Sequence, residues 1–291
     1  MKKVFPLLLL AASLLAGCGS KDDGTFQGYV EGEYVRVAAP FAGNLTELSV
    51  KRGDTVQAGA PLYKLEQENE SAARQEAGER LKKASDSLES AKAQRVQAAA
   101  QLKHAEQTYR RTQELAGKKF LSPQALDDAR SVLDQARAGL SSLDAQATAA
   151  QADTAAAQAV LKQAEWKLAQ KTVAAPVAGR VEDTAFVTGE WVTAGSAVVS
   201  ILPPQNIKAR FFVPEPRLGA LRLGQAVTLR CDGCPAPVAA KISFISHEAE
   251  YTPPVIYSKE NRTKLVFLIE ARTSPQDAEK LRPGQPVDVT L

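Results

Sequence analysis

The most constraining feature of this sequence is a repeat whose two copies lie far apart in the chain. Residues 37–43, Val-Ala-Ala-Pro-Phe-Ala-Gly, recur as residues 173–179, Val-Ala-Ala-Pro-Val-Ala-Gly. Over residues 35–65 and 171–201, ten of 31 aligned positions are identical without a gap. Several matches are prolines and glycines, which end or bend strands, so the two segments are predicted to be copies of one structural unit. The later matches pair Gly53, Val56, Ala58 and Gly59 with Gly189, Val192, Ala194 and Gly195.

Each copy has the pattern of short strands. Val35 and Val37 alternate with Arg36, as in a strand with one buried face. Gly53-Asp54 and Gly189-Glu190 stand where turns are expected. Two copies with one hydrophobic face each are predicted to bury those faces against each other, which makes residues 35–65 plus 171–201 a β-sandwich.

The spacings Ala-Pro-x-Ala-Gly and Gly-x-x-Val-x-Ala-Gly resemble the two halves of a biotinyl/lipoyl-type β-sandwich. In that family the halves meet at a tight hairpin whose lysine carries biotin or lipoate. Here residues 66–170 separate the halves, so no modifiable lysine can occupy that position. The resemblance implies the carrier fold without a cofactor and without an enzymatic role.

Residues 66–170 are predicted to form an antiparallel coiled-coil hairpin. They contain one proline, Pro123, and are rich in good helix formers. Gly117 suits a helix C-cap, Ser122 an N-cap and Pro123 a first helical position, so the chain is expected to turn between them. Two arms of about 48 residues give a rod of roughly 70 Å.

A heptad repeat supports the coiled coil on both arms. Arg95 breaks the apolar seam and marks either a change of packing or a side chain whose stem is buried and whose charge reaches solvent. The first arm carries Leu81, Leu88, Arg95, Leu102 and Tyr109 with Ala84, Ala91, Ala98, Ala105 and Thr112. The second carries Leu126, Leu133, Leu140, Ala147, Thr154, Leu161 and Leu168 with Ala129, Ala136, Leu143, Ala150, Ala157 and Ala164.

The predicted tip carries a more specific pattern. Arg111, Leu115 and Ser122 are followed by Leu126 and Asp127, and this spacing resembles the hairpin-tip motif of periplasmic adaptors that dock TolC-type outer-membrane channels. The resemblance implies that these five residues contact the channel. The alternative is structural: a solvated Arg111, a Leu115 in the seam and a Ser122 that only caps a helix.

Residues 202–291 are predicted to form a small β-barrel. Several short strand patterns separated by turn signals are typical of that architecture. The turns include Leu223-Gly224-Gln225 and Pro283-Gly284-Gln285. The candidate strands are residues 208–213, 226–229, 241–245, 265–269 and 287–289. The whole chain is therefore expected to be an α+β multi-domain protein.

The order of half-sandwich, hairpin, half-sandwich and barrel resembles the membrane fusion proteins, the HlyD-type periplasmic adaptors. That family implies an inner-membrane transporter, a TolC-type channel and a ring of adaptor copies as partners. Residues 248–253, 259–262 and 265–267 look like those of adaptors that accompany ABC-type exporters. The chain also stops just after the barrel, which favours the same ABC-type partner over a proton-driven pump.

Cys231-Asp232-Gly233-Cys234 is a second local motif. In an exported protein an oxidising compartment favours a disulfide, and Asp-Gly suggests a hairpin turn. Free thiols are an open alternative. Redox chemistry is disfavoured because the surroundings have strand character and a low thiol pKa needs a helix N-terminus or a nearby cation. A metal site is disfavoured because His104 and His247 are the only histidines.

The N-terminus has the form of a lipoprotein signal. Lys2 and Lys3 precede an apolar run that is too short to span a membrane. Leu15-Ala16-Gly17-Cys18 resembles the lipobox of bacterial lipoproteins, which implies acylation at Cys18 and removal of residues 1–17. Residues 18–34 are then a lipidated tether and a first strand, and the protein is expected in the periplasm, anchored to the inner membrane.

Composition limits the functional classes. A net charge of +3 is too small to indicate a nucleic-acid partner. The sequence has no phosphate-binding Gly-x-x-x-x-Gly-Lys-Ser/Thr loop and no cluster of a nucleophile with a base, so an ATPase or hydrolase is not expected. Met1 is the only methionine, which disfavours copper export. A non-enzymatic adaptor without cofactor or metal is predicted, and the alternatives are a structural periplasmic spacer and a cargo-binding periplasmic protein.

Overall fold

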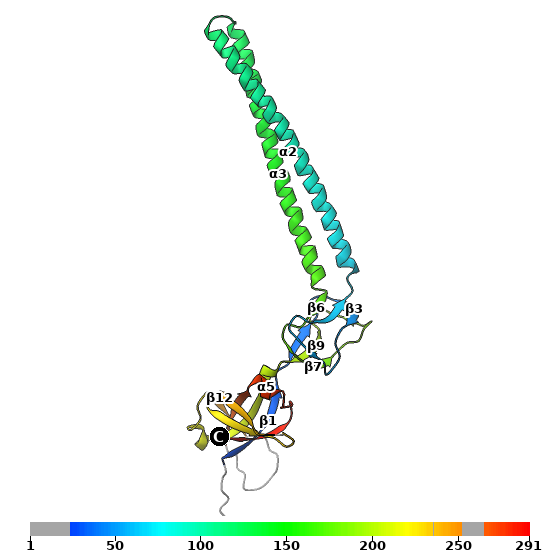
Figure 1. The fold of residues 1–291 in the computed structure, drawn as a ribbon, viewed down its shortest axis with the longest axis vertical. Helices are drawn as coiled ribbons and strands as arrows, with labels where there is room; N and C mark the ends of the chain where they lie inside the picture. Colours follow the sequence, from blue (N-terminus) through cyan, green and yellow to red (C-terminus); the bar gives the residue numbers. More distant parts are fainter. Residues whose placement is uncertain (1–23, 235, 252–264) are drawn as a thin grey trace, which may run out of the picture.

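The computed structural model describes residues 24–234, 236–251 and 265–291. Three domains follow one another in a long, bent molecule: a β-barrel at one end, a β-sandwich in the middle and a helical hairpin at the other end (Figure 1). The chain passes through the barrel and the sandwich twice, once before the hairpin and once after it. The predicted α+β fold class, with a split sandwich, a coiled-coil hairpin and a small barrel, is confirmed.

Both copies of the repeat contribute to each sheet of the sandwich. The strand orders are β2-β9-β7-β4 and β6-β5-β3-β8. Gly53 N–H donates to the Val181 carbonyl and the related Gly189 N–H donates to the Leu45 carbonyl, both at 2.8 Å. These two glycines have φ values of 94° and 98°, a left-handed conformation that suits glycine. The strands are β2 (Val35–Ala38), β3 (Gly43–Leu48), β4 (Thr55–Val56), β5 (Pro61–Leu65), β6 (Thr172–Ala174), β7 (Gly179–Thr184), β8 (Trp191–Val192) and β9 (Ala197–Leu202).

The sandwich core is symmetric in the same way. Leu45 and its repeat equivalent Val181 are both fully buried, and Val56 and its equivalent Val192 are both buried. The two copies of the repeat therefore bury their hydrophobic faces against each other, as predicted. Tyr63 on β5 is also buried, its hydroxyl has no hydrogen-bond partner in the described part of the chain, and burial raises its pKa to about 12.

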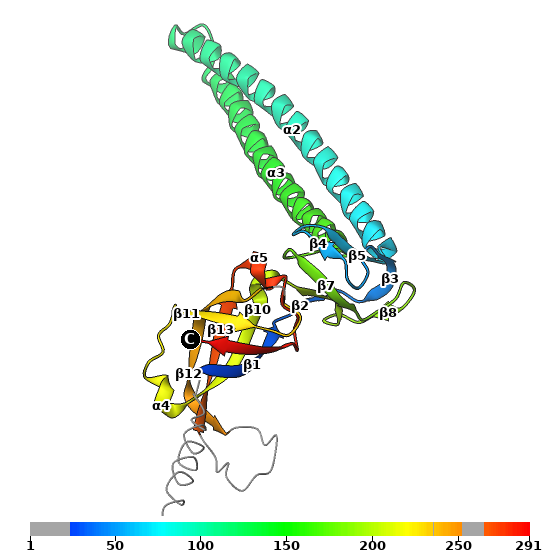
Figure 2. The same ribbon diagram turned by 60° about the horizontal axis from the view of Figure 1, so that its bottom comes forward.

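The insertion forms two long antiparallel helices, α2 (Glu68–Gly117) and α3 (Pro123–Ala169). At 1.5 Å per residue they project about 70–75 Å from the sandwich (Figure 2). Ala98, Ala105, Leu133 and Ala157, all predicted seam positions, are buried between them. Alanine at these positions lets the helices approach closely, and the coiled-coil prediction is confirmed.

Arg95 keeps its charge at the surface of the hairpin. Its guanidinium pairs with the carboxylate of Asp144 on α3, and both side chains are about half exposed. The break in the apolar seam is thus occupied by a cross-helix ion pair. Nearer the sandwich, the Thr154 hydroxyl donates to the Ala84 carbonyl of α2 at 3.3 Å.

The last domain is a closed six-stranded barrel with the order β1-β10-β13-β12-β11-β14. Its elements are β1 (Thr25–Gly32), β10 (Ile207–Pro214), α4 (Glu215–Leu218), β11 (Ala226–Arg230), β12 (Val238–Tyr251), β13 (Leu265–Thr273), α5 (Pro275–Ala278) and β14 (Pro286–Thr290), with the short 3-10 helix η1 (Pro204–Asn206) before β10. Each strand expected between residues 208 and 289 lies within one of these strands. β12 runs well beyond residues 241–245, and its pairing with β13 contains two register shifts.

One barrel strand comes from outside residues 202–291. β1, which the sequence analysis placed with the tether, closes the barrel between β10 and β14. Phe26 and Val30 point into the barrel core. A Cβ atom at Gly28, midway between them, would lie 2.4 Å from the Arg210 carbonyl, so glycine allows β1 to pack against β10. This glycine also interrupts the alternating pattern that would have identified the strand.

Candidate functional site at the hairpin tip

The tip is held together by backbone hydrogen bonds at the end of α2. Phe120 N–H donates to the Leu115 carbonyl at 3.0 Å, and Lys119 N–H donates to the Ala116 carbonyl at 2.9 Å. This pair of bonds is the Schellman motif, which satisfies carbonyls that the helix end leaves without partners. The turn between the helices therefore has one defined shape before any partner binds.

The position of the cap differs from the prediction. Gly117 was expected as the C-cap, but α2 continues through Gly117 and the cap residue is Lys118. The left-handed residue of the motif is Lys119, with φ of 61°, where glycine is usual. The hydrogen-bond pattern, and not the position of the glycine, decides where the helix ends.

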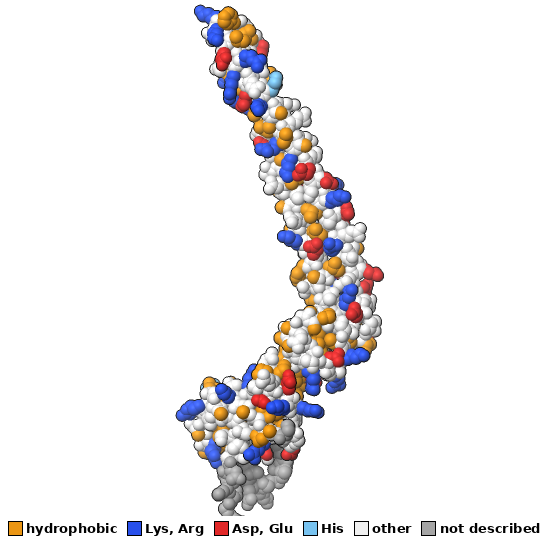
Figure 3. All heavy atoms as spheres, in the orientation of Figure 1, with side chains coloured by type: hydrophobic (Ala, Val, Ile, Leu, Met, Phe, Trp, Pro, Cys, Tyr) orange, Lys and Arg blue, Asp and Glu red, His pale blue; other side chains and the backbone are white. Residues whose placement is uncertain are grey.

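Apolar side chains are exposed at this turn. Phe120 is 74% exposed, the largest value among the described large hydrophobic residues, and Leu115 and Leu121 are 38% and 39% exposed. Lys118 and Lys119 lie beside them, and residues 115–126 contain no acidic side chain. Figure 3 shows hydrophobic and basic side chains together at this end of the molecule. The tip is an apolar apex with a basic border, the kind of surface that marks a binding site.

The five predicted docking residues all lie at the tip: Arg111 and Leu115 near the end of α2, Ser122 at the N-cap of α3, and Leu126 and Asp127 at the start of α3. Arg111 on α2 is exposed and makes no ion pair within the described residues. Leu115 is one helical turn further along the same helix, partly exposed. Leu126 on α3 is half-buried and the adjacent Asp127 is exposed. Their contact with a channel remains a prediction.

Ser122 caps α3. Its hydroxyl oxygen accepts a hydrogen bond from the Ala125 N–H at 3.3 Å, and Pro123 takes the first helical position, as the sequence analysis expected. This explains part of the motif structurally. It leaves room for a second role, since the Ser122 side chain is exposed.

Phe120 was missed by the sequence analysis. It lies between two predicted docking residues, Leu115 and Ser122, and it is the most prominent apolar group of the tip. The signal was present as an apolar pair, Phe120-Leu121, directly after two lysines in a turn. A phenylalanine in a turn more often packs inward, so its exposure required the structure.

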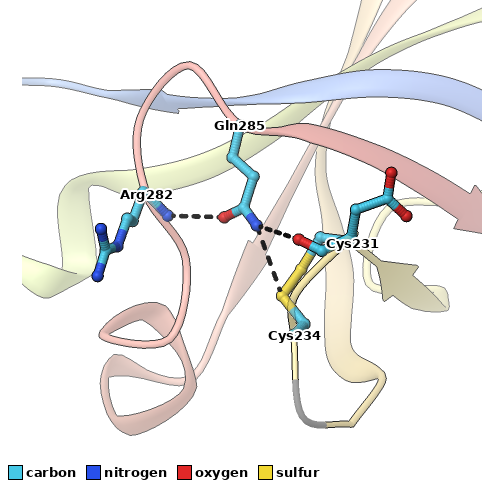
Figure 4. Close-up of a disulfide and its surroundings, with 5 residues drawn as sticks. Cys231, Cys234, Arg282 and Gln285 are labelled. Atoms are coloured by element: carbon cyan, nitrogen blue, oxygen red, sulfur yellow. Dashed lines mark hydrogen bonds between the residues drawn. A yellow bond between two sulfur atoms is a disulfide. The ribbon is translucent and has the colours of Figure 1, made fainter.

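The two cysteines lie at the barrel, far from the tip. Cys231 and Cys234 form a disulfide in the turn between β11 and β12 (Figure 4). Cys234 N–H donates to the Cys231 carbonyl at 3.1 Å and Gly233 has φ of 84°, which fits the hairpin turn suggested by Asp-Gly. The Gln285 amide donates to the Asp232 carbonyl at 3.2 Å and so ties this turn to the start of β14.

The described part of the chain shows neither a metal site nor a membrane-spanning helix. No group of three or more His, Cys, Asp or Glu side chains is arranged to hold a metal ion in residues 24–234, 236–251 and 265–291. Within the same residues, no helix has the length and apolar character needed to span a bilayer. Cys18 and residues 252–264, which include part of the segment compared with ABC-type adaptors, lie outside the described part of the chain.

Comparison with known proteins gives consistent results. A family model described as "RND MFP, alpha-helical hairpin domain" matches residues 87–171. A UPF0194 membrane protein of Citrobacter koseri is 31% identical over an alignment that covers 100% of this chain and 98% of that protein. The UPF0194 membrane protein YbhG of Salmonella gallinarum is 32% identical, with 92% and 89% covered. A UPF0194 membrane protein of an Enterobacter strain is 32% identical over a shorter region, 43% of this chain and 38% of that protein.

Two solved structures have the same fold. The membrane fusion protein Spr0693 from Streptococcus pneumoniae superposes with a TM-score of 0.59 at 23% identity, covering 91% of this chain and 96% of that one. MacA from Actinobacillus actinomycetemcomitans superposes with a TM-score of 0.57 at 21% identity, covering 91% and 76%. The sequence match along the full length shows that the chain belongs to the family of the UPF0194 membrane proteins, and its fold is that of the membrane fusion proteins.

Proposed function

We propose that this protein is a non-enzymatic periplasmic adaptor that links an inner-membrane export transporter to a TolC-type outer-membrane channel. The observation that carries the proposal is the exposed apex at the end of the hairpin, where Leu115, Phe120 and Leu121 are exposed beside two lysines. A hairpin of about 70–75 Å buries little beyond its own seam, so its use is to carry this apex away from the sandwich.

The mechanism is mechanical. The transporter supplies energy, and the adaptor holds the transporter and the channel in one assembly. At the tip, Leu115 and Phe120 bury apolar surface on the channel, while Arg111 supplies a charge-assisted hydrogen bond. The preformed Schellman turn lowers the entropy cost of docking, because this segment is already ordered.

The other end of the molecule is proposed to lie at the inner membrane. Acylation at Cys18 would attach the chain there, and several copies would form a ring around the export path. An ABC-type exporter is the favoured transporter, on the resemblance of residues 248–253 and 265–267 to those of ABC-associated adaptors. The hairpin match is to a model named for RND-pump adaptors, so a proton-driven transporter is the second candidate.

Docking is tested by site-specific cross-linking from the tip to the channel in cells. Leu115→Asp places a charge in the apolar apex and should abolish cross-linking, while the melting temperature stays near that of the wild type because the position is close to the hairpin end. Val96→Asp is the matched control, since Val96 is 66% exposed on the shaft of α2. Wild-type cross-linking by the Leu115→Asp protein would refute the docking role.

Co-purification decides among the remaining alternatives. An adaptor should be recovered with a transporter and an outer-membrane channel. Recovery of an ATPase subunit with them would identify an ABC-type exporter, and a transporter without one would indicate the proton-driven class. Recovery of the intact chain without either partner would favour a structural spacer. Direct binding of exported compounds to the purified protein would favour a cargo-binding role.

A further inference from the structure

Two charged side chains are buried in the described residues, and each lies at a junction between domains. Lys171 is 5% exposed and Lys208 is 7% exposed. Lys171 lies between the end of α3 and the start of β6, where the hairpin meets the sandwich. Lys208 is the second residue of β10, where the sandwich leads into the barrel. A buried charge is costly unless it is paired, so each site has to supply partners.

At the hairpin root, the Lys171 ammonium contacts the sandwich and the first helix together. Its Nζ donates to the Ala42 carbonyl, in the turn between β2 and β3, at 2.9 Å. It also lies 3.0 Å from the Glu70 carboxylate in the first turn of α2. Lys171 itself directly follows Gln170, the C-cap of α3, so one side chain joins both arms of the hairpin to the sandwich. A Cβ atom at Gly43 would lie 3.2 Å from this Nζ, which shows how closely the site surrounds it.

At the barrel neck, Lys208 at the start of β10 ties one of the two connections between sandwich and barrel to the barrel itself. Its Nζ lies 2.6 Å from Glu33, in the connection between β1 and β2, and 2.8 Å from Glu270 on β13. The Asn206 amide, in the other connection, donates to the Glu33 carbonyl at 2.8 Å. Around this core lie Glu31, 3.7 Å from Lys208, Arg210, 3.1 Å from Glu31, and Arg272, 3.6 Å from Glu33.

The charges at the neck support one another. The hydrogen bond from Lys208 lowers the pKa of the Glu33 carboxyl, with a further contribution from Arg272. Burial acts to lower the pKa of Lys208, but the hydrogen bonds and charges of Glu270 and Glu33 outweigh it, and the pKa is raised. Both groups are therefore charged at neutral pH.

We propose that Lys171 and Lys208 are positioning residues that fix the angle of the hairpin on the sandwich and of the sandwich on the barrel. Apolar contacts tolerate small rotations because they are not directional. A buried ammonium does not: rotation at the hairpin root would separate Lys171 from Glu70 or from the Ala42 carbonyl, and rotation at the neck would draw Glu33 away from Lys208. Either loss leaves a buried charge less well compensated. This inference goes beyond the channel-docking role and holds whichever partners the tip and barrel bind.

The test measures distances within the full-length protein in detergent. Spin labels carried on unnatural amino acids, which leave the native cysteines untouched, are placed at exposed positions 93 on α2, 57 in the sandwich and 220 in the barrel. Lys171→Met should broaden and shift the 93–57 distance distribution, and Lys208→Met the 57–220 distribution. Thermal stability should fall, because removing one partner of a buried ion pair leaves Glu70, or Glu33 and Glu270, without compensation. The distances are therefore compared at a temperature at which each variant is folded.

Controls separate positioning from general stability. Lys162→Met on α3 and Lys241→Met on β12 remove exposed lysines and should leave both distributions unchanged. If a buried-lysine variant does not fold, the same distances are measured in Glu70→Gln and Glu33→Gln, which remove the negative partner instead. These two side chains are partly exposed. Distributions with the wild-type mean and width in folded variants at both joints would overturn the proposal. None of these measurements involves the channel, so they can fail while the docking role stands.

Discussion

The backbone N–H of Phe120 donates to the carbonyl of Leu115 at 3.0 Å, and this bond places two exposed apolar residues at the end of the hairpin. In Schellman motifs the residues at these two positions often contact each other. Here both remain exposed to different extents, 74% for Phe120 and 38% for Leu115. The same hydrogen bond that ends α2 therefore also fixes the position of the apex that is proposed to dock the channel.

Phe120→Ser should weaken binding to the channel without changing the fold. Burial of a phenylalanine contributes about 1.5–3 kcal/mol, so its loss should lower affinity on the order of 10- to 100-fold. Binding of the purified protein to the immobilised channel measures this directly. Leu223→Ser is the control, since Leu223 is 68% exposed in a barrel turn. Equal affinities for the Phe120→Ser protein and the wild type would remove Phe120 from the interface.

Lys119→Gly should stabilise the tip. Lys119 has φ of 61°, and the left-handed conformation costs a non-glycine residue about 1–2 kcal/mol. Glycine avoids this cost but has more freedom in the unfolded chain, so a net gain of roughly 0.5–1 kcal/mol is expected. Hydrogen exchange of the amides at the end of α2 reports the local change. Faster exchange in the variant would show that the lysine side chain makes a compensating contact.

Ser122 has two possible roles that substitution can separate. Ser122→Ala removes the cap on α3 and should cost about 1 kcal/mol. Ser122→Asp keeps a capping oxygen and should restore helix stability, yet it brings a negative charge to a basic tip. If Ser122 also contacts the channel, cross-linking should fall in both variants. Full cross-linking by Ser122→Asp together with restored stability would reduce Ser122 to a cap.

The sequence predicted most of the architecture because its signals are local and periodic. The offset repeat predicted the sandwich, and the heptads predicted a hairpin whose seam includes Ala98 and Leu133. β1 was missed as a barrel strand because its pairing with β10 and β14 joins residues far apart in sequence. Gly28, which that pairing requires, also weakens the local strand pattern.

The tip was predicted less completely than the shaft. Ser122 followed from a strong capping preference, whereas the cap at Lys118 depends on two hydrogen bonds that no residue preference reveals. The burial of Lys171 and Lys208 was also not predicted. Lysine is rarely buried, and these two are buried only because the fold brings Glu70, Glu33 and Glu270 to them.

Tyr63→Phe should stabilise the sandwich and change its behaviour in alkali. The Tyr63 hydroxyl is buried without a hydrogen-bond partner in the described residues, and such a group costs about 1–3 kcal/mol. Removing it should therefore raise the free energy of unfolding at pH 7 by roughly 1 kcal/mol or more. Tyr34→Phe is the control at this pH, since Tyr34 is 42% exposed.

The pH dependence follows from the pKa of about 12 that burial gives Tyr63. In the unfolded chain tyrosine ionises near pH 10, whereas buried Tyr63 stays neutral until about pH 12. Ionisation therefore stabilises only the unfolded chain between these values, and stability falls as the pH rises from 10 toward 12. At pH 10.5 the wild type should have lost about 0.8 kcal/mol that the phenylalanine variant keeps. Urea unfolding followed by the fluorescence of Trp166 and Trp191, which lie at the hairpin root and in the sandwich, measures both values. A difference between the two proteins that is the same at pH 7 and pH 10.5 would mean that the Tyr63 hydroxyl reaches solvent in the folded protein.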